Sequence, residues 1–406
     1  MNAQSDYQTN CVKRSITILP ASYNVKKIFF TILFSLYLIL PLIGFVLLPS
    51  RVICLLPLFL GLLALILLSI RIRREHIPIY IYIGVLVTSF LISSIIVGRT
   101  AGSVYVPCFY IVSSFGIAMI LIRGYVYSWG GYIAFYSLAV YYFIFMLAGT
   151  PATTLTVGPS TNGSSIAMLV SCISLYIILS MENKKINLIP GLLTLAISIW
   201  GGGASGIISS FVLLFGLLFV RLRSKSKYIF IVLICLFVIY LFSDVLFTFV
   251  TNNWFFSNAV ENLSSKMVVG NSARWPMWTN YFNNLDIFRL IFGVNVFEAP
   301  WSEGIVYDYN YHNSFIHLHA QTGLVGLLTM ALIILAVLKY YRINKVFLIL
   351  LLAFILRFST DSFVFFSRFD FIPFFFIFYF LMSTNLRVPH AKPLSADAIR
   401  HKGNLK

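Results

Sequence analysis

The sequence consists mainly of long apolar runs that are separated by short polar segments. Hydrophobic residues make up 60% of the 406-residue chain, and charged residues make up only 10%. A run of about 20 apolar residues can cross the hydrocarbon core of a bilayer as one helix. The pattern therefore predicts an all-α, polytopic membrane helix bundle, whose first partner is the lipid bilayer.

The apolar runs predict about 12 transmembrane helices in a membrane domain that covers residues 28–384. Residues 1–27 and 385–406 are polar tails, and one long loop, 251–313, separates the ninth helix from the tenth. We place the helices near 28–49, 52–70, 77–98, 104–122, 131–149, 165–181, 186–201, 205–220, 229–250, 316–338, 346–360 and 363–384.

The basic residues divide between two sets of loops that alternate along the chain. Of the 29 lysines and arginines, one set of loops holds only Arg51, Arg99, Lys266, Arg274, Arg289, Arg357 and Arg368. Loops rich in lysine and arginine stay in the cytoplasm, so we expect both tails there and the long loop on the opposite, periplasmic side. The net charge of +17 then reflects topology, and we expect no nucleic-acid partner.

Three of the six histidines lie in one stretch, Tyr311–Gly326, which opens polar and continues as an apolar run. His312 stands where the long loop meets the tenth predicted helix. Imidazole titrates near pH ~6.5, so His312 is a candidate general base, or else a side chain that hydrogen-bonds at a helix start. Asn313 is a candidate either for substrate binding or for the N-cap of that helix.

The histidine row contains no carboxylate at ligand spacing, so we expect neither a metal site nor any other cofactor. If the segment were helical throughout, His312 and His319 would share a face and His317 would point elsewhere. We expect His317 and His319 to pack or hydrogen-bond inside the bundle.

The long loop holds two arginines, Arg274 and Arg289, that are candidates for phosphate binding because guanidinium is a rigid fork of donors that keeps its charge. The alternative is an interfacial arginine beside lipid phosphates. Directly after Arg274, the spacing of Trp275, Trp278 and Phe282 predicts a short helix with one aromatic face.

Three further arginines, Arg99, Arg357 and Arg368, lie at the outer ends of predicted helices. There an arginine either faces a polar cavity or snorkels to the membrane surface. An ion pair between Asp361 and Arg368 is a purely structural explanation for both residues.

Several of these features together resemble the superfamily of O-antigen ligases and polymerases (Wzy-type). His312 and Asn313 are followed by Gly323 and Gly326 after a long loop. The stretch 270–278 and the later Gly293 are similar to the family's arginine-containing loop helix and the glycine after it. The small-residue segment 154–165 and the predicted topology also agree. Specific residues match only within about 270–326.

The resemblance implies a metal-independent glycosyltransferase of the bacterial cell inner membrane. Its donor would be an undecaprenyl-pyrophosphate-linked oligosaccharide, and its active site would lie on the periplasmic side. His312 would be the catalytic histidine and Arg274 the catalytic loop arginine. The second cation for the pyrophosphate stays open among Arg99, Arg289 and Arg368.

One departure from the family pattern favours a polymerase, which joins repeat units, over a ligase, which transfers glycan to lipid A-core. Ligases usually carry an arginine in a short loop where this chain has Gly203–Gly206. A flippase for the same lipid-linked units is the non-enzymatic alternative. Transport calls for charges in several helices, whereas Asp244 is almost alone in the apolar runs. A chain-length regulator and a flippase are the candidate protein partners of a polymerase.

Overall fold

The computed structural model describes residues 21–46, 51–69, 73–155, 163–222, 274–302 and 311–385. Within these ranges every regular element is a helix, and seven helices are long and apolar enough to cross a membrane. The prediction of a helical, multi-pass membrane bundle is therefore confirmed, while the count of 12 spans stays a prediction. The predicted span 229–250, with Asp244, and the parts 251–273 and 303–310 of the loop 251–313 lie outside the described residues.

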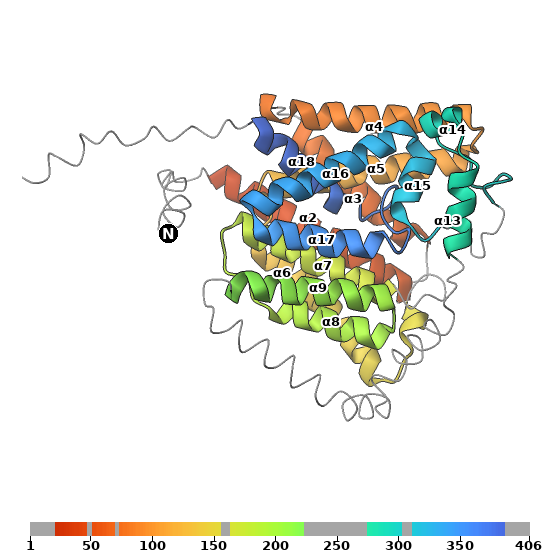
Figure 1. Ribbon diagram of the computed structural model, residues 1–406. Helices are drawn as coiled ribbons and strands as arrows, with labels where there is room; N and C mark the ends of the chain where they lie inside the picture. The colour runs from red at the N-terminus through yellow and green to blue at the C-terminus, as the bar shows by residue number, and fades with distance from the viewer. Residues whose placement is uncertain are drawn as a thin grey trace, which may run out of the picture.

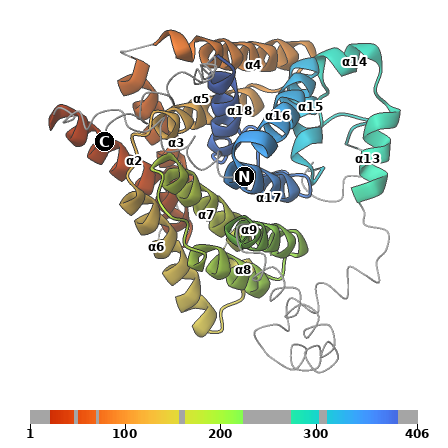
Figure 2. The same cartoon turned by 60° about the vertical axis from the view of Figure 1, so that its left-hand side comes forward.

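The helices lie side by side in one bundle (Figures 1 and 2). The seven long helices are α2 (Ala21–Val46), α4 (Ile77–Ile96) with the preceding turn η1 (Arg74–His76), α5 (Ala101–Ile122), α6 (Ser128–Leu147), α7 (Gly163–Met181), α9 (Ala204–Leu222) and α16 (Leu324–Ile343). The remaining elements are α3 (Arg51–Ser69), η2 (Ala152–Leu155), α8 (Ile189–Gly201), α13 (Arg274–Asn283), α14 (Ile287–Phe292), α15 (Ser314–Thr322), α17 (Lys345–Phe358) and α18 (Phe371–Asn385).

Helix α18 forms a phenylalanine-rich part of the core. Phe374, Phe376 and Phe378 are fully buried, and Phe378 meets Phe115 of α5 edge to face. The Tyr340 hydroxyl of α16 donates to the Phe376 carbonyl over 2.5 Å. Edge-to-face aromatic pairs add to the energy of apolar burial, so these contacts hold α18 between α5 and α16. They also fix the position of the segment that precedes α18.

The predicted tenth span, 316–338, is two helices in the structure. Helix α15 ends at Thr322 and α16 begins at Leu324, with Gly323 between them at φ +55°. A Cβ at Gly323 would lie 2.0 Å from the Ile291 carbonyl oxygen and 2.8 Å from the Gly293 nitrogen. The break therefore lets the end of α14 cross α15 at backbone contact, which only glycine permits.

The segment 359–370 between α17 and α18 is not helical, although we expected the last span to begin at 363. Helix α17 has 14 residues and α18 has 15. At about 1.5 Å per residue, each is shorter than the ~30 Å hydrocarbon core. Non-helical backbone within the hydrocarbon core needs protein partners for its polar groups. The partners of segment 359–370 come from the elements around His312.

Candidate active site

Several side chains hold the segment 359–370 in shape, among them Asp370 and Ser314. The buried Asp370 carboxylate accepts hydrogen bonds from the backbone nitrogens of Phe366 (2.6 Å) and Ser367 (3.0 Å). These bonds support Phe365 and Phe366, whose φ angles of +62° and +69° are unfavourable for bulky residues. The Ser314 hydroxyl donates to the Asp361 carbonyl over 2.7 Å. The segment is thus tied to the first turn of α15.

His312 lies one residue before the cap of α15 and outside that helix. Its φ of +49° is a left-handed conformation that costs about 1–3 kcal/mol and is concentrated at functional sites. The next residue is fixed on both sides: the Asn313 nitrogen donates to Ser362 Oγ over 3.0 Å, and its side-chain oxygen caps the helix at Phe315. The His312 Nδ1 atom consequently lies 3.7 Å from the Asp361 carboxylate.

Arg357 of α17 is the cation that the sequence argument left out of the site. Its side chain is 0% exposed. It donates from Nη1 to Ser205 Oγ over 2.8 Å and from Nη2 to Asp361 Oδ2 over 3.4 Å. The four-residue spacing of Arg357 and Asp361 is the sequence signal that could have identified the pair. We expected Asp361 to pair with Arg368, and its ion pairs in the structure are with Arg357 and His312.

Arg274, the first residue of α13, joins the same cluster from the opposite side. Its Nη1 donates to the Thr360 carbonyl over 2.9 Å, next to Asp361. Its side chain is only partly buried. Arg274 can therefore present donors to a ligand while it anchors α13 to the segment 359–370.

The four side chains of His312, Asp361, Arg357 and Arg274 form what we call the His312 cluster. Burial alone would raise the pKa of the Asp361 carboxyl, but the contact with His312 and the charge of Arg357 outweigh it and lower the pKa below its usual range. Asp361 is therefore ionised at neutral pH. Two guanidiniums around one carboxylate leave the cluster with excess positive charge, which suits an anionic ligand.

Arg99 lies at the same end of the bundle, where it hydrogen-bonds to backbone carbonyls. Its guanidinium donates to the carbonyl oxygens of Ala320 (2.6 Å), Val294 (3.0 Å) and Gln321 (3.0 Å). These carbonyls come from the end of α15 and the segment after α14. Arg99 thus clamps the place where the two elements cross, which occupies the donors that we had considered for phosphate.

Arg289 and Arg368 also have protein partners. Arg289 pairs with Asp286, the N-cap of α14, and both side chains are exposed, at 41% and 53%. The Arg368 guanidinium lies over the Phe369 ring at 4.8 Å. Arg289 therefore lies at the protein surface, and Arg368 lies in the segment 359–370.

The other two histidines of the stretch point away from His312, because the helix begins only at Ser314. His317 packs on the Phe366 ring with centroids 5.9 Å apart. The Tyr281 hydroxyl donates to His319 Nδ1 over 2.5 Å, and His319 Nε2 lies 3.1 Å from the Leu290 carbonyl. These bonds require the proton on Nε2. His319 thereby joins α13, α14 and α15 into one unit.

The short helix predicted after Arg274 is present as α13, but it is rotated relative to our expectation. It buries Met277 and Tyr281, which are one turn apart, whereas Phe282 is 59% exposed. The Trp278 indole nitrogen donates to the Tyr311 carbonyl over 2.8 Å. The buried face of α13 therefore packs on the residue before His312, which helps to place that side chain.

Comparisons with known proteins identify no matching protein family, no matching curated protein and no matching solved structure. The His312 cluster combines an imidazole that is 22% exposed, a carboxylate beside it and two guanidiniums. Such an arrangement can remove a proton from a hydroxyl and can stabilise negative charge on a phosphate.

Proposed function

We propose that the protein is a membrane glycosyltransferase that polymerises lipid-linked repeat units of O-antigen or a related surface polysaccharide. It would act at the periplasmic face of the bacterial inner membrane, with an undecaprenyl-pyrophosphate-linked glycan as donor. The sugar acceptor is the next lipid-linked repeat unit. The observation that carries the proposal is the His312 cluster, which holds a base and cationic side chains at one end of a membrane bundle.

In the proposed reaction, a hydroxyl oxygen of the acceptor sugar attacks the anomeric carbon of the donor glycan. The new carbon–oxygen bond forms as the bond from that carbon to the phosphate oxygen breaks, and undecaprenyl pyrophosphate leaves with the electron pair. His312 accepts the hydroxyl proton. The ionised Asp361 stabilises the resulting imidazolium, as the carboxylate does in a Ser-His-Asp triad.

The arginines would divide the remaining work. Arg274 is partly exposed and can donate to the pyrophosphate as its charge grows. Arg357 is fully buried, so it acts as a positioning residue that holds Asp361 and adds positive potential. Donors fixed before the reaction stabilise the leaving group without reorganising. Guanidiniums in this arrangement would take the role that a metal ion has in many other glycosyl transfers.

A ligase that transfers glycan to lipid A-core is the second candidate, and one contact favours it. The family's ligases usually carry an arginine in the short loop that corresponds to Gly203–Gly206. Here Arg357 reaches that turn from α17 and donates to Ser205. A guanidinium is therefore available at the turn, which weakens the argument against a ligase that the sequence alone suggested.

A lipopolysaccharide gel of a deletion strain tests the proposal. Loss of a polymerase leaves a core that bears a single repeat unit. Loss of the ligase leaves a bare core while long glycan accumulates on the lipid carrier. A bare core with single units trapped on the cytoplasmic face would indicate a flippase, and an unchanged ladder would contradict all three functions for this polysaccharide.

A further inference from the structure

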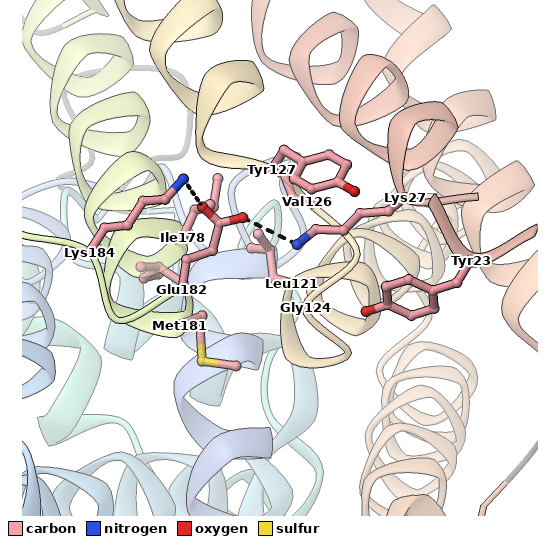
Figure 3. A pocket seen from close by; sticks show the side chains of 11 residues that line it. Tyr23, Lys27, Leu121, Gly124, Val126, Tyr127, Ile178, Met181, Glu182 and Lys184 are labelled. Carbon is pink, nitrogen blue, oxygen red and sulfur yellow. Dashed lines mark hydrogen bonds and ion pairs between the residues drawn. The ribbon is translucent and has the colours of Figure 1, made fainter. Parts of the chain in front are cut away.

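A second polar cluster lies at the end of the bundle opposite the His312 cluster. It surrounds an open cavity of about 510 Å³ between the start of α2, the connection from α5 to α6 and the end of α7. Figure 3 shows Lys27 and Lys184 approaching the Glu182 carboxylate from two sides, with Tyr23 and Tyr127 nearby. These five residues form what we call the lysine pocket.

The lysine pocket holds two positively charged side chains and one carboxylate. Lys27 Nζ lies 3.2 Å from Glu182 Oε1, and Lys184 Nζ lies 2.8 Å from Glu182 Oε2. Lys27 also lies 4.1 Å above the Tyr127 ring. The side chains of Lys27 and Glu182 are only 13% and 14% exposed. Two ammonium groups thus share one carboxylate: Lys27 is poorly hydrated, whereas Lys184 is half-exposed, at 53%.

The lysines also keep hydrogen-bond capacity for a ligand. An ammonium group has three donors. In the part of the chain that the structure describes, Lys27 donates to Glu182, and Lys184 donates to Ser128 Oγ over 2.7 Å besides its contact with Glu182. An anion in the cavity could accept the remaining donors and would balance the excess charge.

The other walls of the cavity are apolar, with Leu121, Ile177 and Met181 among the lining side chains. A charged rim above an apolar wall at the end of membrane helices matches the two halves of a phospholipid. Further basic residues, Lys26, Arg123 and Lys185, lie at the start of α2 and just after α5 and α7. Basic residues beside membrane helices attract anionic lipid.

We propose that the lysine pocket binds a phosphate group, which is carried by an anionic phospholipid of the adjoining leaflet or by a small soluble phosphate. The phosphate oxygens accept hydrogen bonds from Lys27 and Lys184. With a phospholipid, the glycerol end of an acyl chain lies against Met181, the partly exposed side chain of the apolar wall. This site is separate from the His312 cluster and does not depend on the proposed glycosyl transfer.

Native mass spectrometry of the purified full-length protein in neutral detergent tests this site. Phosphatidylglycerol is titrated in, and phosphatidylcholine serves as the zwitterionic comparison. We expect Lys184→Gln to weaken the tightest phosphatidylglycerol binding by about tenfold, or about 1.4 kcal/mol. Glu182→Gln removes the competing carboxylate, so we expect it to strengthen binding. Lys185→Gln is the matched control, since it removes the same charge from a neighbouring residue that does not line the cavity.

The outcomes separate the alternatives. Lys184 is half-exposed, at 53%, so its substitution leaves a folded protein even if Glu182→Gln does not. Equal effects of Lys184→Gln and Lys185→Gln would refute the site. Weaker binding in a folded Glu182→Gln variant would identify the cluster as a structural ion pair only. Displacement of bound phosphatidylglycerol by millimolar inorganic phosphate would show that soluble phosphates enter the pocket, and resistance to phosphate would identify phospholipid as the ligand.

Discussion

Substitution of Asp361 by Asn should strongly destabilise the protein, because it leaves the Arg357 guanidinium buried without a counter-charge. The two charges are 3.4 Å apart, and the side chains are 13% and 0% exposed. At an effective dielectric constant of ~20 their attraction is about 5 kcal/mol. Removal of one partner of a buried pair costs ~3–5 kcal/mol in comparable cases. We therefore expect Asp361→Asn to lose ~3–5 kcal/mol of unfolding free energy.

A double-mutant cycle separates the pair from other effects of the substitution. Arg357→Gln and the double variant complete the cycle, and the double variant should be more stable than the sum of the single losses predicts, by ~3 kcal/mol. The assay is reversible unfolding of the purified protein in mixed micelles by increasing dodecyl sulfate. Asp286→Asn is the matched control, because Asp286 forms the same type of pair with Arg289 at the surface.

The control should unfold like the unsubstituted protein, because exposed ion pairs contribute little. A coupling energy below ~1 kcal/mol for Asp361 and Arg357 would refute the reasoning, since it would place their pair in the range of exposed pairs. A folded Asp361→Asn variant that elongates glycan normally would show that the carboxylate is not needed by His312.

Four further predictions address the His312 cluster and its support. His312→Ala should abolish glycan elongation in a complemented deletion strain without a loss of protein level in the membrane. Normal chain lengths on a gel would contradict the role of His312 as base. Arg274→Lys should also lose most activity, because an ammonium cannot supply the forked donors. The pKa of Asp361 is lowered from 3.8, so its contribution to stability is fully present above pH 3.8 and is lost as the pH falls through the lower pKa of the folded state. Acid unfolding curves of Asp361→Asn should therefore show less pH dependence than those of the unsubstituted protein. Identical curves would show that Asp361 does not contribute to the acid dependence of stability. Gly323→Ala should prevent folding or trafficking, because the new Cβ would meet the Ile291 carbonyl at 2.0 Å; Gly102→Ala, where nothing lies within 4 Å, is the control and should be tolerated in the same expression assay.

The class of fold was predictable because it depends on local composition. A backbone segment in hydrocarbon must satisfy its own hydrogen bonds, so a long apolar run has almost no alternative to a helix. The ends of the helices were less predictable. Asp370 binds the nitrogens of Phe366 and Ser367, which keeps α18 from starting before Phe371. That competition between a side chain and the backbone leaves little trace in the hydropathy of the segment.

The candidate site was only partly predictable. His312, Asn313 and Arg274 were identified from their positions, and the structure places His312 and Arg274 around one segment. Asn313 uses its side-chain oxygen as the N-cap of α15. For Arg357 the sequence left a polar cavity and snorkelling to the surface equally open, and Arg357 was not among the candidate site residues. Its partner Ser205 is 152 positions away in the sequence, so no local pattern could indicate this contact.

The sequence by itself determined that the chain is a helical membrane protein, and it indicated the polar stretch where chemistry is expected. It did so because hydropathy and residue type act over about 20 neighbouring residues. Tertiary structure alone decided that Arg99 is a clamp on the end of α15, that Arg357 reaches Ser205, and that Lys27 reaches Glu182. These contacts join residues far apart in the chain, and their energies depend on burial that exists only once the helices have packed.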